Sequence, residues 1–157
     1  MLFRSNQAGG YKIPTGSVIR RGIQGATQQY WFTDVDLYVA QYVGQPFIYN
    51  FNKIGSNCGL IASKAVTLMS GNLYWMSQKQ FFILTQGSLP QPIPCPVWDV
   101  IFQNINYNYL DNVKCGSNSQ FNEIIWFYPS ANSLDGTKDR KSTRLNSSHG
   151  YISYAVF

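Results

Sequence analysis

Residues 65–93 read AVTLMSGNLYWMSQKQFFILTQGSLPQPI, and this stretch decides the fold. Three apolar and aromatic runs, at residues 65–69, 73–77 and 81–85, have the length and composition of β-strands. The polar breaks between them, such as Ser70-Gly71-Asn72, are short enough to connect antiparallel neighbours. The sequence therefore predicts an antiparallel β-meander.

The next segment combines proline with helical spacing. Prolines at every second position make residues 89–97 extended, and they exclude a central strand because proline has no N–H to donate. Residues 97–105 (VWDVIFQNI) have apolar spacing that favours a short helix, with Asp99 in its first turn. Residues 113–117 and 123–128 are predicted as two further strands, the second apolar enough to be an inner one.

The upstream part is less regular. Residues 6–29 are rich in Gly and Gln and are interpreted as a loop with one short strand at residues 17–20. Alternation in residues 30–42 (YWFTDVDLYVAQY) predicts a strand with Asp34, Asp36 and Tyr38 on one side. A helix beginning at Asp34 is the alternative. Residues 43–51 are expected to be extended and residues 57–62 to form a turn with a small apolar plug.

These patterns predict a mainly β fold. We expect an antiparallel β-meander that forms part of a β-propeller, with one short helix near residues 97–105. No matched repeat period is present, so the sequence supports a single blade and the start of another.

Both ends of the chain look foreign to the protein. Residues 139–157 (DRKSTRLNSSHGYISYAVF) resemble a single-frame translation of a short-read sequencing adapter, and residues 1–5 (MLFRS) resemble the complementary adapter end. A native basic tail is the alternative. We therefore expect residues 6–138 to be an internal, metagenomic fragment of a longer β-rich chain.

Composition limits the function classes. The formal net charge is +5, from 12 Lys and Arg against 7 Asp and Glu. Without the adapter-like residues Arg4, Arg140, Lys141, Arg144 and Asp139, the balance is 8 minus 6, or +2. This weakens the argument that a basic chain binds nucleic acid. Aromatic residues make up 16% and charged residues only 12%, which favours β-structure packed against other chains.

Catalytic and metal-binding residues are scarce. The only histidine, His149, lies in the adapter-like tail, so residues 6–138 have no Ser/His/Asp or Cys/His site and no histidine metal site. Cys58, Cys95 and Cys115 are widely spaced, and buried free thiols in a reducing compartment are the expected state. Three thiolates on zinc are the alternative. No cofactor is expected, because no phosphate-binding glycine motif is present.

The charged residues have ordinary explanations. Asp34 and Asp36 on one strand face could suit a cation or an acid/base pair, but a solvent-facing edge explains them as well. Arg20-Arg21 can contact phosphate or an acidic neighbour, or form a solvated loop pair. The candidates for a glycosidase pair of carboxylates are Asp34, Asp36, Asp99, Asp111 and Glu123.

Aromatic side chains offer the other candidate site. They can pack the core and subunit contacts, or they can form a stacking platform for sugars or bases. The residues concerned are Trp31, Trp75, Phe81, Phe82, Trp98, Trp126 and Phe127. The packing role is the expected one in short alternating strands.

Residues 57–102 (NCGLIASKAVTLMSGNLYWMSQKQFFILTQGSLPQPIPCPVWDVIF) and 121–130 (FNEIIWFYPS) resemble virion structural proteins of tailed bacteriophages. The most similar type is the tail nozzle, or packaged-DNA-stabilisation protein, of short-tailed phages. The resemblance spans about residues 31–133 and implies a multi-bladed propeller assembled as a ring below the portal. It implies no catalytic residues.

The function that this resemblance implies is non-enzymatic. We expect a tail component, in the nozzle or head–tail junction, that retains packaged DNA. Its expected partners are other virion proteins (portal or tail adaptor) and further copies of itself in a homo-oligomeric ring. Contact with DNA would be indirect, no membrane is involved, and assembly would occur in the host cytoplasm. The alternatives are a carbohydrate- or receptor-binding tail domain and a fragment of a propeller glycosidase.

Overall fold

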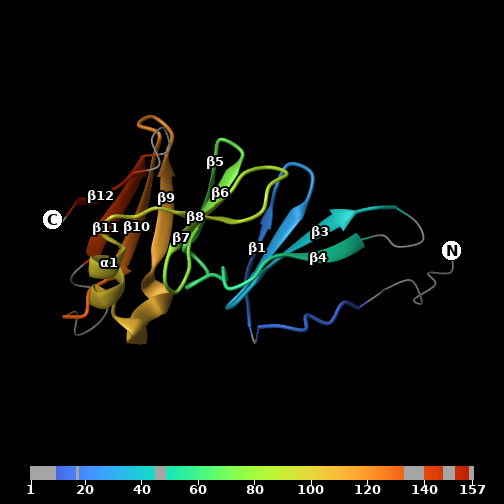
Figure 1. The fold of residues 1–157 in the computed structure, drawn as a ribbon, viewed down its shortest axis with the longest axis horizontal. Helices are drawn as coiled ribbons and strands as arrows, with labels where there is room; N and C mark the ends of the chain where they lie inside the picture. Colours follow the sequence, from blue (N-terminus) through green and yellow to red (C-terminus); the bar gives the residue numbers. More distant parts are fainter. Residues whose placement is uncertain (1–9, 17, 45–48, 133–139, 147–150, 156–157) are drawn as a thin grey trace, which may run out of the picture.

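The computed structural model describes residues 10–16, 18–44, 49–132, 140–146 and 151–155. Their strands form three four-stranded antiparallel sheets, and each sheet is a meander of consecutive strands. The sheets lie side by side in chain order along the long axis of the molecule (Figure 1). The prediction of a mainly β, antiparallel fold is confirmed. The described strands do not close into a ring of sheets.

The first sheet was not expected in full. It consists of β1 (Ile19–Gln24), β2 (Gln29–Thr33), β3 (Leu37–Tyr42) and β4 (Tyr49–Gly55), in that spatial order. Of the strand predicted at residues 17–20, only its end coincides with β1, which continues to Gln24 with a bulge between Ile19 and Arg21.

The expected single strand face for Asp34, Asp36 and Tyr38 is wrong. The chain turns between β2 and β3, because Thr33 bonds back to Asp36 through both backbone and hydroxyl. Local side-chain bonding of this kind competes with an extended strand.

The second sheet matches the prediction closely. It contains β5 (Val66–Met69), β6 (Asn72–Met76), β7 (Phe81–Leu84) and β8 (Gln91–Ile93). Gly71 has a φ of 80°, in the left-handed region that the tight β5–β6 turn requires. The proline-rich strand β8 lies at the edge of the sheet, as expected from its missing N–H groups.

A helical connection leads into the third sheet. The predicted helix is present as α1 (Trp98–Asn104), and the 3₁₀ helix η2 (Tyr107–Asn112) follows it. The strands β9 (Lys114–Asn118) and β10 (Glu123–Pro129) then pair as predicted. Strand β10 is an inner strand, as predicted, and Ile124, Trp126, Tyr128 and Pro129 are its buried residues.

Backbone of the adapter-like tail completes this sheet. Strands β11 (Arg140–Asn146) and β12 (Tyr151–Ala155) continue it from β10. Backbone hydrogen bonding along a strand edge does not depend on side-chain identity. The interpretation of residues 1–5 and 139–157 as foreign therefore stays a prediction.

Three sheets replace the expected blade and partial blade. The first sheet was not predicted in full because β1 (IRRGIQ) is largely polar and none of its apolar residues is fully buried. Its pairing is decided by contacts with β2 rather than by its own alternation.

One linker joins the sheets. Residues 56–65 contribute Cys58, Leu60, Ile61 and neighbouring alanines to a single core that includes residues of every sheet. Leu60 N donates to Thr33 O in the first sheet, and Ile61 N donates to Met76 O in the second. The expected apolar plug at residues 57–62 is thus the centre of the fold.

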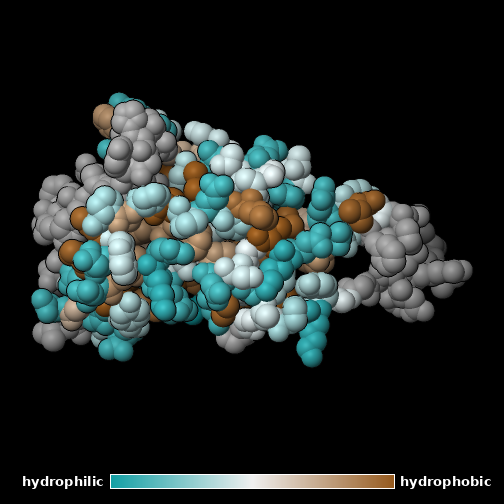
Figure 2. Space-filling view, in the orientation of Figure 1, coloured by the Kyte–Doolittle hydropathy of each residue, from teal (hydrophilic) through white to brown (hydrophobic). Residues whose placement is uncertain are grey.

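The surface is mixed. On the face drawn in Figure 2, hydrophilic residues are interspersed with hydrophobic groups, the larger of which lie near the middle of the molecule. No helix among the described residues is long and apolar enough to cross a membrane.

Candidate functional site

The first strands of the three sheets meet along one line, which we call the seam. The carbonyl of Lys64, two residues before β5, accepts a hydrogen bond of 2.8 Å from the backbone N–H of Cys115 in β9. Lys64 and Lys114 are partners in a parallel β-bridge. On the other side, the Arg21 guanidinium in β1 donates to the Ser63 carbonyl at 3.0 Å. Residues far apart in sequence are therefore neighbours here.

A groove of about 370 Å³ follows the seam. Three cations line it, one from each sheet or its approach: Arg21, Lys64 and Lys114, all exposed. Its other lining residues are Ile23, Val66, Thr67, Leu68 and Cys115. No carboxylate is among these lining residues, so the seam groove has a positive electrostatic potential.

The Arg20-Arg21 pair is divided between two surroundings. Arg20 lies 3.8 Å from Asp111 of η2, which joins the first sheet to the segment before β9. The Asp111 side chain is 87% exposed, and such exposed pairs contribute little stability. Arg21 faces the seam groove instead. Arg20 thus meets the acidic neighbour considered from the sequence, whereas Arg21 has no ion pair with an acid in the described part of the chain.

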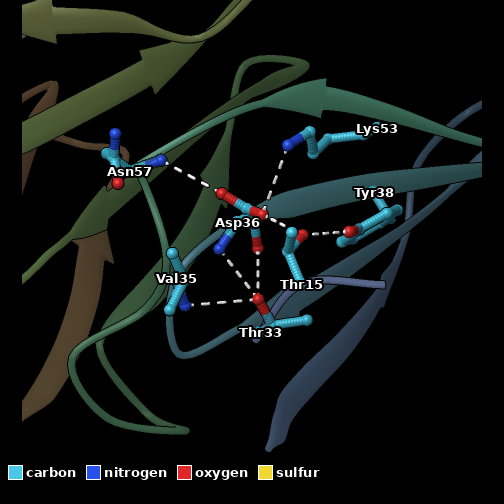
Figure 3. A network of polar contacts seen from close by, with 7 residues as sticks. All are labelled: Thr15, Thr33, Val35, Asp36, Tyr38, Lys53 and Asn57. Carbon is cyan, nitrogen blue, oxygen red and sulfur yellow. Dashed lines mark hydrogen bonds and ion pairs between the residues drawn. The ribbon is translucent and has the colours of Figure 1, made fainter. Parts of the chain in front are cut away.

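Asp36 is the centre of a polar network that Figure 3 shows. Asp36 is only 2% exposed. Its carboxylate accepts one hydrogen bond from the Thr15 hydroxyl and another, of 3.1 Å, from the Asn57 backbone N–H. The carboxylate also lies 3.5 Å from the Lys53 ammonium. The Thr15 hydroxyl also lies 2.6 Å from the Tyr38 hydroxyl. The network ties the segment before β1, the β2–β3 turn, β4 and the linker together, which indicates a structural role.

The other acids do not join Asp36. Asp34 accepts a hydrogen bond from the Val18 backbone at 3.3 Å, so the two turn carboxylates serve different partners. Asp99 lies in the first turn of α1, as predicted, and Glu123 begins β10. No cluster of three or more His, Cys, Asp or Glu suited to a metal ion occurs among the described residues.

The candidate aromatic residues fall into two groups. Trp75, Phe81, Phe82 and Trp126 are buried, with Trp75 stacked on Phe82 and Phe81 tilted against Trp126. Buried rings present no face to a ligand. Trp31 is partly buried, and its ring packs against Gly22 of β1. A Cβ added at Gly22 would lie 3.2 Å from this ring.

Trp98 and Phe127 are the exposed members of the set, at 53% and 39%. Trp98 borders a second groove of about 410 Å³, with Lys79, Gln80 and the proline-rich residues 92–95. An exposed indole beside prolines is an arrangement on which a sugar ring could stack. Phe127 lies in another sheet, in register with Lys114, so the two rings come from different elements.

The three cysteines are free thiols. Burial, followed by the nearby charge of Asp36, raises the pKa of the Cys58 thiol to about 11. Burial also raises the pKa of Cys95 and of Cys115 above the ordinary value. Protonated thiols are poor nucleophiles and poor metal ligands at neutral pH.

No protein-family model and no curated protein sequence matches the chain.

Sequence reasoning missed Lys64 and Lys114. Each is an isolated lysine in the sequence, and the two are brought together only by the parallel bridge between the second and third sheets. A prediction of the strand order across sheets would have been needed to find them.

Proposed function

We propose that the protein is a non-enzymatic structural component of a bacteriophage tail, in the nozzle or head–tail junction, where it helps to retain packaged DNA. The phage assignment comes from the sequence resemblance at residues 57–102 and 121–130. What supports it in the fold is the succession of two four-stranded meanders and the β9–β10 hairpin, which are the strands of the three sheets that lie outside the adapter-like tail.

The single observation that carries the proposal is the seam. Successive four-stranded sheets with their first strands next to one another are the arrangement of neighbouring propeller blades. The parallel Lys64–Lys114 bridge and the Arg21–Ser63 hydrogen bond provide this adjacency. Further blades supplied by a longer chain would extend the same row around an axis.

A mechanical role agrees with the interior. The linker and the buried rings of Trp75 and Trp126 connect all three sheets through one continuous core. Such a core transmits load between sheets, because close-packed interiors deform little. The low charge of residues 6–138 would favour contact with neighbouring subunits.

The test is the oligomeric state of the intact, adapter-free protein. We expect a closed ring of defined stoichiometry by native mass spectrometry and by electron microscopy. A protein that stays monomeric at assembly concentrations, or that turns over a substrate, would contradict the proposal.

A carbohydrate- or receptor-binding tail domain is the second candidate. The exposed Trp98 beside the groove at residues 92–95 favours it. A glycan-binding screen of the intact protein and of Trp98→Ala separates the two functions. Binding that Trp98→Ala abolishes, in a protein that forms no ring, would favour this second candidate.

A further inference from the structure

We propose that the seam groove binds the sugar-phosphate backbone of duplex nucleic acid, with Arg21, Lys64 and Lys114 as its phosphate-contacting residues. The proposal deepens the proposed function, because it places a direct DNA contact on this chain where the resemblance implies only an indirect one.

The first argument is the distribution of charge. Outside the adapter-like ends the chain has only eight cations, and four of them, Arg20, Arg21, Lys64 and Lys114, lie at the seam. Among the described residues, the acid that forms an ion pair with this group is Asp111, which contacts Arg20 outside the groove lining. Three cations therefore remain for a ligand, in a chain that is otherwise poor in charge.

The second argument is the Lys64–Lys114 pair. Bridge partners lie on neighbouring stretches of backbone about 4.8 Å apart, so the two lysine side chains leave the backbone side by side. Like charges directly opposite one another destabilise a sheet. An anion between them would remove that repulsion. Both residues are exposed, so a ligand can reach them.

The third argument concerns the class of anion. Phosphates carry the charge of a nucleic acid at regular spacing, and guanidinium and ammonium groups are their usual partners. The lining of the seam groove has no aromatic ring, and the exposed Phe127 in register with Lys114 is a single ring, so successive unpaired bases would have no continuous surface on which to stack. This favours a duplex, which is held by its backbone, over a single strand. Binding would then be independent of base sequence.

The experiment is a titration of the intact, adapter-free protein with a short labelled DNA duplex by fluorescence anisotropy at several salt concentrations, because Arg140, Lys141 and Arg144 of the adapter-like tail would add phosphate contacts of their own. Three neutralised phosphates predict a slope of log K against log salt of about −2.7, so affinity should fall roughly 40-fold between about 50 and about 200 mM salt. Single-stranded DNA of equal length should bind more weakly. Polyglutamate of equal charge tests for an acidic protein segment as the ligand.

Variants assign the contact to residues. Arg21→Gln, Lys64→Gln and Lys114→Gln should each weaken binding and make the slope less steep by about one. The matched control is Lys79→Gln, an exposed lysine at the other groove, which should leave affinity and slope unchanged. In the absence of DNA, Lys64→Gln should have a midpoint of thermal unfolding equal to or above that of the parent chain, because it removes the like-charge pair.

Three results would overturn the inference: no duplex binding at about 50 mM salt, equal or tighter binding of polyglutamate, or unchanged slopes in all three seam variants. The ring measurement is separate. A ring without DNA affinity would leave the proposed function standing and remove this inference. DNA affinity in a protein that never forms a ring would leave this inference standing and remove the proposed function.

Discussion

The backbone carbonyl of Ala65 accepts two hydrogen bonds from two different sheets. The indole N–H of Trp126 in β10 donates at 3.1 Å, and the backbone N–H of Met76 at the end of β6 donates at 3.0 Å. Ala65 and Trp126 are both fully buried. This one carbonyl therefore joins the third sheet to the second at the start of β5.

Replacing Trp126 with phenylalanine should destabilise the protein by about 2–3 kcal/mol. The change removes a buried donor and leaves a void where the larger ring was. Urea unfolding followed by circular dichroism measures the effect. The control is Trp98→Phe, at an exposed indole, which should stay within about 0.5 kcal/mol of the parent chain. Equal losses in the two variants would contradict the role assigned to Trp126.

Gly59→Ala should be strongly destabilising. A Cβ at Gly59 would lie 2.3 Å from the backbone of Asp34 and Val35, and rigid backbone cannot move aside cheaply. Overpacking of this kind costs about 1–3 kcal/mol or more. Gly116→Ala is the matched control, because nothing lies within 4 Å of its Cβ position. We expect thermal unfolding to show a large drop for the first variant and none for the second. A Gly59→Ala protein as stable as the parent would disprove the close contact.

Much of the second sheet could be predicted because its signals are local. Polar breaks around Gly71 and Gly87 separate short apolar strands, and the prolines of residues 90–96 assign β8 to an edge. Helix α1 has apolar spacing of its own. In each case the residues that determine the element lie within the element.

The first sheet and the seam could not be predicted because their signals are not local. Strand β1 is defined by its partner, and the turn at Asp34 is defined by hydroxyl bonds from Thr33. The alternation of residues 34–38 is compatible with a strand until those bonds are known. Lys64 and Lys114 are bridge partners although fifty residues separate them in the sequence, and the residues next to each lysine do not indicate this pairing.

Asp36→Asn should destabilise the protein by about 1–3 kcal/mol. The amide would direct two donors toward groups that already donate, such as the Thr15 hydroxyl or the Lys53 ammonium, in a nearly water-free site. Chemical unfolding measures the loss. Asp111→Asn makes the same chemical change on an exposed side chain and should have an effect below about 0.5 kcal/mol. The network would not be structural if the two variants were equally stable.

Stability should fall in alkaline solution through Cys58. The pKa of its thiol is raised from 9.0 to about 11, first by burial and then by the Asp36 charge. Between pH 9 and 11 the unfolded chain loses this proton while the folded chain keeps it, so the unfolded state binds fewer protons and stability decreases as pH rises. Below pH 9 the group contributes no slope. The decrease is at most about 1.4 kcal/mol per pH unit.

Comparison of variants isolates this effect from other groups that titrate in the same range. Cys58→Ala should be less stable than the parent at pH 8, because it leaves a void, but its stability should decline less steeply from pH 9 to 11. Val66→Ala also leaves a void at a buried position but removes no ionisable group, so it should keep the parent slope. Urea midpoints at half-unit pH intervals provide the measurement. Parallel profiles for the parent chain and Cys58→Ala would mean that the Cys58 thiol ionises as readily in the folded protein as in the unfolded chain.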